Sequence, residues 1–130
     1  MISYVEGLKG EDRIRNILIN LGIHFFQADL LFSYQDKWYL GEIKHQEAFE
    51  PPPFRGHGLP NWQIDARLEF QKQFGIRAVL FIVEKKTDEI YYQFLDVLMA
   101  GEKYQTNGYS PRMIFPIKNY KRFKEVGFEL

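Results

Sequence analysis

The 130-residue chain is long enough for one domain that buries about two thirds of its unfolded surface, so no second domain is needed. Its 45% apolar residues, with 12 Phe, 8 Tyr and 2 Trp, argue against disorder and predict an aromatic-rich core. Seventeen basic residues balance seventeen acidic ones, so the chain lacks the overall positive charge that would indicate binding to nucleic acid. The absence of cysteine excludes disulfides, thiolate metal sites and a cysteine nucleophile.

The N-terminal residues lack a basic start followed by an apolar run, and no stretch approaches the roughly 18 consecutive apolar residues that cross a bilayer. The absence of cysteine fits a reducing compartment. Together these features predict a soluble, cytoplasmic protein without a membrane partner.

The first half of the chain predicts a helix, a hairpin and a loop. In residues 6–21, leucine and isoleucine recur at three- and four-residue steps, which predicts an amphipathic helix ended by Gly22. Residues 27–46 predict two strands joined by a tight turn. Residues 46–60 hold four of the six prolines and two glycines, so they predict a long ordered loop that is neither helix nor central strand.

The second half continues with alternating helices and strands. A helix over residues 62–74 is predicted, capped by Asn61 and closed by Gly75. Because the first hairpin must be antiparallel while helices and strands are interspersed, the order favours an α/β fold: a mixed sheet with helices on both faces. The further predicted elements are an apolar strand over 77–83, a charged turn at 84–88, a strand over 89–94, a short helix over 95–100, a polar loop at 102–111, a strand over 112–117 and a basic helical turn at 119–125.

The register of the hairpin decides which charges meet. If Gln35 and Asp36 form a two-residue turn, counting back in antiparallel register brings Asp29 opposite Glu42. A loop one residue longer would send Asp29 to the other face. Side chains at opposed positions have Cβ atoms about 4.5–5.5 Å apart, so two carboxylates there repel each other unless a proton or a metal ion lies between them. The alternative is an exposed hairpin whose charges are solvated.

Lys44 follows Glu42 by two residues and therefore shares its face of the strand. Carboxylate oxygens suit Mg²⁺ or Mn²⁺, and two acids with one backbone carbonyl, here that of Ile43, suffice for such an ion. An ammonium beside the ion can orient a water molecule or stabilise charge on a phosphate. The set therefore predicts phosphodiester hydrolysis.

Asp29 followed by Glu42-Ile43-Lys44 resembles the signature of the PD-(D/E)XK nuclease superfamily, which includes Holliday-junction resolvases, many restriction endonucleases and recombination exonucleases. The resemblance covers roughly residues 6–83 and implies one restriction-endonuclease-like domain over residues 1–130. It implies a metal held by Asp29, Glu42 and the carbonyl of Ile43, with Lys44 assisting the attacking water. Ala28 stands where the motif has proline.

The resemblance also implies supporting residues and partners. Glu11 on the opening helix is the candidate for a further ligand, with Glu6 as its competitor, and Gln63 is the candidate for a glutamine beside the site. Gln63, Arg67 and Gln71 are spaced by four, so they line up along one side of their helix. The implied partner is DNA, bound by a homodimer with two such sites, although no stretch is identified as its interface.

Basic and histidine side chains provide candidate contacts to nucleic acid. His57 could approach a phosphate or act as an acid, and the alternative is a solvated turn residue between glycines. The alternatives for the arginines and for the basic tail are an ordinary mixed-charge surface and a solvated helix face. The candidates are Arg55, His57, Arg67, Lys121 and Arg122.

Three functions follow from these residues. The first is a metal-dependent DNA nuclease of the resolvase type. The second is a non-catalytic module that binds nucleic acid or protein on the same fold, and the third is an accessory subunit of a larger nuclease machine. Neutral net charge favours the second, and the presence of both acids and the lysine favours the first.

Overall fold

The computed structural model describes residues 13–14, 16–23, 30–123 and 129–130. Residues 13–14 and 16–20 are helical, as predicted, and the helix ends at Gly22, whose φ is 69°. Gly22 N–H donates to the carbonyl of Ile19 and Ile23 N–H to that of Leu18, which is the Schellman pattern of a glycine-terminated helix. Among the described residues, no helix is long and apolar enough to span a membrane.

The predicted hairpin is present with the predicted register. Strands β1 (Leu30–Tyr34) and β2 (Lys37–Gln46) are antiparallel, with Tyr34 opposite Lys37 and Leu30 opposite Gly41. The turn residues Gln35 and Asp36 have φ of 49° and 64°, the positive values of a type I′ turn. This turn has the right-handed twist of the strands, so two residues suffice to join them and the register is fixed.

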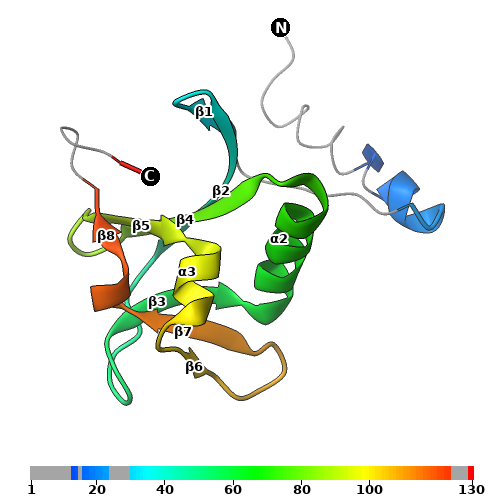
Figure 1. Cartoon of the computed structure of the whole chain (residues 1–130). Coiled ribbons are helices and arrows are strands. Elements are labelled where there is room, and N and C mark those ends of the chain that lie inside the picture. Colours follow the sequence, from blue (N-terminus) through cyan, green and yellow to red (C-terminus); the bar gives the residue numbers. More distant parts are fainter. Residues whose placement is uncertain (1–12, 15, 24–29, 124–128) are drawn as a thin grey trace, which may run out of the picture.

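The hairpin belongs to a mixed sheet (Figure 1). Within the described residues the strand order is β1-β2-β4-β5-β8, and β4 (Arg77–Glu84) lies parallel to β2. Strands β5 (Ile90–Phe94) and β8 (Lys121–Arg122) continue the sheet in antiparallel pairing. The predicted α/β class with a mixed sheet is therefore confirmed.

Two helices follow the predicted bounds. Helix α2 (Asn61–Phe74) ends at Gly75, a left-handed C-cap with φ of 69°, and α3 (Leu95–Ala100) is followed by Gly101. The prediction of Asn61 as N-cap was wrong, because Pro60 holds that position and Asn61 instead donates a hydrogen bond to Gln105, 2.9 Å away.

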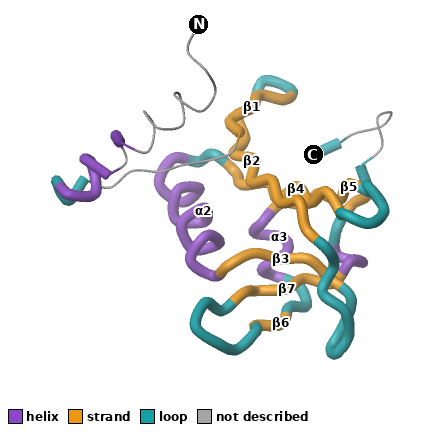
Figure 2. Tube along the Cα trace, turned by 180° about the vertical axis from the view of Figure 1, so that it is seen from behind, coloured by secondary structure: helices purple, strands orange, loops and turns teal. Residues whose placement is uncertain are grey.

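A second, three-stranded sheet was only partly predicted. Its order is β3-β7-β6, formed by β3 (Gly56–Pro60), β7 (Arg112–Pro116) and β6 (Tyr104–Gln105), and Figure 2 shows it beside α2 and α3. Strand β7 was predicted, whereas β3 was assigned to the proline-rich loop and β6 to a polar loop. The glycines of β3 permit close approach to β7 rather than a turn, because a Cβ on Gly58 would lie 1.8 Å from the carbonyl oxygen of Met113.

The C-terminal basic segment also differs from the prediction. Ile117–Asn119 form a 3-10 turn, and Lys121–Arg122 form β8 instead of a helical turn. Pairing with the edge of β5 gives these residues backbone hydrogen bonds that a single isolated helical turn lacks.

The core lies between the mixed sheet on one side and α2, α3 and the small sheet on the other. Every second residue of β4, starting from Ala78, faces this core, and its other members come from both helices and the small sheet. The fully buried members include Leu59, Ile64, Leu80, Ile82, Leu95, Leu98 and Phe115.

The opposite face of the mixed sheet carries aromatic side chains in contact with one another. Phe32 stacks on Tyr39 with ring centroids 5.6 Å apart and meets Phe81 at 5.9 Å. Phe81 in turn stacks on Tyr92 at 6.3 Å. The sheet is therefore covered by apolar groups on both faces, which places the polar residues at the middle of β2 in an unusual environment.

Candidate functional site

Glu42 lies in the middle of β2 and is buried, with 6% of its surface exposed. It faces the same side as Leu40 and Lys44, as the strand alternation predicted. The Nζ atom of Lys44 lies 3.4 Å from Oε1 of Glu42, and the lysine side chain is 24% exposed. The acid and the amine of the predicted motif therefore meet at the edge of the core.

Arg67 provides the second cation at Glu42. Its Nε and Nη2 atoms both donate to Oε2 of Glu42, at 3.0 and 2.8 Å. Only 11% of the arginine side chain is exposed. The prediction placed Arg67 on a basic flank in contact with DNA, whereas the structure turns it inward onto the carboxylate, because a buried charge requires a partner.

Helix α2 runs along this face in the direction opposite to β2, and hydrogen bonds that join α2, β2 and the neighbouring strands follow this order. Gln71 accepts a hydrogen bond from Ala78 N–H at 2.9 Å, and Ala78 pairs with Leu40. One turn earlier Arg67 meets Glu42, and beyond the start of the helix Gln46 donates to the carbonyl of Gly58 at 3.1 Å.

Gln63 lies one turn before Arg67 on the same side of α2, which brings it level with Lys44. Its Oε1 atom is buried and has no hydrogen-bond partner among the described residues. A buried amide oxygen without a donor is costly, so it indicates a position where a water or a cation completes the contacts. The predicted position of Gln63 beside the motif stays a prediction.

The candidate metal donors are oxygen atoms. The carboxylate of Glu42, the backbone carbonyl of Ile43 and the amide oxygen of Gln63 are hard ligands of the kind that Mg²⁺ and Mn²⁺ take, so the chemistry of these donors suits such an ion. The predicted ligands Asp29 and Glu11 lie outside the described residues. Within the part of the chain that the structure describes, no three His, Cys, Asp or Glu side chains form a group that could hold a metal.

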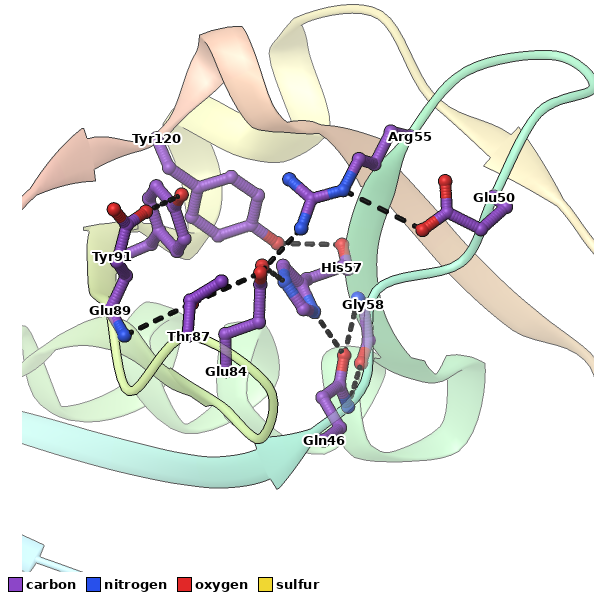
Figure 3. Close-up of polar contacts among 10 residues, drawn as sticks. All are labelled: Gln46, Glu50, Arg55, His57, Gly58, Glu84, Thr87, Glu89, Tyr91 and Tyr120. Carbon is purple, nitrogen blue, oxygen red and sulfur yellow. Dashed lines mark hydrogen bonds and ion pairs between the residues drawn. The ribbon is translucent and has the colours of Figure 1, made fainter.

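His57 lies in the core and not on a loop surface (Figure 3). It is fully buried in β3, with Nε2 2.7 Å from Oε2 of Glu84 and Nδ1 3.0 Å from Oε1 of Gln46. Tyr120 donates a hydrogen bond to its backbone carbonyl at 2.6 Å. This position leaves no route for a phosphate to reach the ring, so the predicted contact of His57 with nucleic acid does not fit the structure.

Arg55 belongs to the same buried cluster. It forms an ion pair with Oε1 of Glu84, which also accepts a hydrogen bond from Thr87 at 3.2 Å. The arginine side chain remains 40% exposed, so part of it faces solvent. The cluster joins the ends of β2 and β4 to β3, and it therefore fastens the small sheet to the mixed sheet.

Burial raises the pKa of Glu84, but the hydrogen bonds from His57 and Arg55 and the charge of Arg55 act more strongly, so the pKa is lowered from its ordinary value. A carboxylate with a lowered pKa in the folded state stabilises the protein above its unfolded pKa, here about 4.5, and this contribution is lost as the pH falls.

We therefore expect the free energy of unfolding, measured in urea, to fall as the pH is lowered below about 4.5, toward the lowered pKa that Glu84 has in the folded state. The Glu84→Gln variant lacks the titrating group and is expected to be less stable at pH 6 but to lose less stability over the same interval. Parallel curves for the two proteins would show that Glu84 does not contribute to the acid sensitivity.

Lys121 and Arg122 are exposed on β8, at the edge of the mixed sheet. Arg122 forms an ion pair with Glu89. Their exposure is compatible with contact to a phosphate backbone, which stays a prediction. They lie on a different element from Glu42 and Lys44, so the structure does not bring all the predicted residues into one group.

Sequence reasoning missed the partners of the two buried carboxylates. Arg67 and Glu42 are 25 residues apart, and His57 and Glu84 are 27 apart. The four-residue spacing of Gln63, Arg67 and Gln71 was the available signal, since it aligned them on the side of α2 that faces β2. No comparable signal linked His57 to Glu84.

The resulting class is a mixed α/β domain with a buried Glu-x-Lys motif on its second described strand. A search of known structures shows the same fold in the Holliday junction resolvase of the archaeal hyperthermophile Archaeoglobus fulgidus, with a TM-score of 0.50 and 13% sequence identity. The match covers 91% of this chain and 94% of the resolvase chain. No protein-family model and no curated protein sequence matches.

Proposed function

We propose that this protein is a metal-dependent nuclease that hydrolyses DNA phosphodiester bonds, with branched DNA as its preferred substrate. The observation that carries the proposal is the ion pair of the buried Glu42 with Lys44 on one strand of a fold shared with a resolvase. The unpartnered amide oxygen of Gln63, on the helix whose Arg67 contacts Glu42, supports it. Fold likeness alone does not define chemistry, whereas these side chains have the chemical groups that the reaction requires.

In this proposal Asp29, Glu42 and the carbonyl of Ile43 hold Mg²⁺ or Mn²⁺. The bound ion supplies polarisation of a phosphate oxygen and a more acidic water. Lys44 lies 3.4 Å from Oε1 of Glu42, where its ammonium can orient the attacking water and stabilise negative charge on the phosphate. Gln63 can accept a hydrogen bond from that water, and Glu11 is the candidate for a further ligand.

The test is cleavage of branched, single-stranded and duplex DNA in Mg²⁺ or Mn²⁺ by the wild type and by Asp29→Ala. Removing a ligand of the proposed ion is expected to lower the rate by about 100-fold or more, the effect of losing one main stabilising group in an active site. Asp65→Ala, which removes an exposed carboxylate of α2, is the matched control and should retain full activity. Equal rates for wild type and Asp29→Ala would remove the catalytic assignment.

A second candidate is a binding module without catalysis. It is favoured by one observation: Glu42 already has two cationic partners, Arg67 and Lys44, and so has a structural role without a metal ion. Calorimetric titration with Mn²⁺ separates the two candidates. Binding that is abolished in Glu42→Ala supports the nuclease, whereas a folded wild type that does not bind Mn²⁺ under any condition supports the module.

A further inference from the structure

Arg67 occupies one oxygen of the carboxylate that the proposed metal site requires. Its Nε and Nη2 atoms donate to Oε2 of Glu42, while Lys44 lies against Oε1. The negative charge of Glu42 is therefore matched by two positive charges before any metal binds. A divalent cation placed at this carboxylate would be repelled by the guanidinium next to it, and the low exposure of the group limits screening by water.

The guanidinium also suits a second partner. Its planar fork of N–H donors matches the oxygens of a phosphate as well as those of a carboxylate, so Arg67 can exchange one for the other. Its side chain is 11% exposed and comes from the helix that carries Gln63. A DNA phosphate bound beside Lys44 would be a second anion for Arg67, close to the carboxylate of Glu42.

We propose that Arg67 is an exchangeable counter-ion that rests on Glu42 in the free protein and transfers to a DNA phosphate when DNA binds. This inference rests on the proposed nuclease function. The transfer frees Oε2 of Glu42 and adds a negative charge to the site, and both changes favour a divalent cation. DNA and metal therefore bind with positive coupling, and by reciprocity each raises the affinity for the other by the same factor.

The first experiment measures Mn²⁺ affinity by calorimetry in the absence of DNA. Arg67→Gln keeps an amide donor for Glu42 but removes the charge, so it is expected to bind Mn²⁺ about tenfold more tightly than the wild type. Arg67→Lys keeps the charge and should stay close to the wild type. The matched control is Arg77→Gln, because Arg77 donates to Asp96 with similar distances, 2.9 and 2.8 Å, at another carboxylate, and it should leave the affinity unchanged.

The second experiment measures coupling, with a four-way DNA junction as probe and Ca²⁺ as the ion. Fluorescence anisotropy gives the affinity of the wild type for the junction with and without Ca²⁺, and we expect an increase of about tenfold with the ion. In Arg67→Gln this increase in junction affinity should be smaller, because Ca²⁺ can bind Glu42 without the prior displacement of a guanidinium.

The outcomes separate this inference from the proposed function. Weaker or unchanged Mn²⁺ binding in folded Arg67→Gln would overturn the inference, since Arg67 would then merely hold Glu42 in place, and the nuclease proposal would stand. Equal junction affinity with and without Ca²⁺ in the wild type would also overturn it. If the wild type binds neither ion, with or without the junction, both proposals fail.

Discussion

Replacing Gly58 by alanine is expected to destabilise the domain by about 3 kcal/mol or more, at or beyond the upper end of the usual cost of overpacking. Gly58 lies in β3, where a Cβ would stand 1.8 Å from the carbonyl oxygen of Met113 and 2.7 Å from its carbonyl carbon. These atoms belong to the backbone of β7 and cannot move aside as a side chain does. The two strands would have to separate, and with them the buried side chains of Leu59 and Phe115.

The measurement is the free energy of unfolding in urea, with Gly75→Ala as the matched control. Gly75 has nothing within 4 Å of its Cβ position, so its substitution carries only the cost of a left-handed backbone, about 1–2 kcal/mol. If Gly58→Ala proves no less stable than Gly75→Ala, the close approach of β3 to β7 is incorrect.

The Glu84→Ala substitution is expected to cost about 3–5 kcal/mol, the typical penalty for removing one member of a buried ion pair. Glu84 is 2% exposed, and both of its oxygens are in use. Its loss leaves the ring of His57 without its 2.7 Å partner in a site that water does not reach, and it also releases Arg55 and Thr87. The small sheet would then be held to the mixed sheet mainly by apolar contacts.

Glu102→Ala is the control for this prediction, because Glu102 also pairs with a cation, Lys118, at 3.1 Å, but at the surface. Exposed pairs contribute about 0–1 kcal/mol, so this variant should remain close to the wild type in urea unfolding. Equal losses in the two variants would show that the buried cluster adds no more than a surface pair.

Local signals in the sequence predicted much of the fold. The end of α2 followed from Gly75 and the bounds of β4 from a continuous apolar run, because both depend on neighbouring residues. Strand β3 was missed because its two glycines and Pro60, with the three prolines before it, predict a loop, whereas pairing with β7 about 55 residues later decides its conformation. A local pattern carries no information about such a distant partner.

In the candidate site, too, the features set by neighbouring residues were predicted and the contacts between distant residues were not. The shared face of Glu42 and Lys44 followed from strand alternation, and the side of α2 that bears Gln63 followed from helical spacing. The ion pair of Arg67 with Glu42 and the full burial of His57 were missed, since cations and histidines were taken to face solvent. The packing of a helix or of a second sheet decides which acid a buried cation contacts. A short segment of sequence does not predict that packing.

The two-residue turn at Gln35 and Asp36 has a consequence for how this chain can vary. A strand presents its side chains alternately to two faces, so inserting a single residue between Tyr34 and Lys37 would slide β1 by one step against β2. Every side chain of β1 would move to the opposite face of the sheet, so those on the aromatic face would enter the core face and the others would leave it. Insertions of two residues preserve the alternation, so in natural variants of this chain we expect length changes at this hairpin in even numbers.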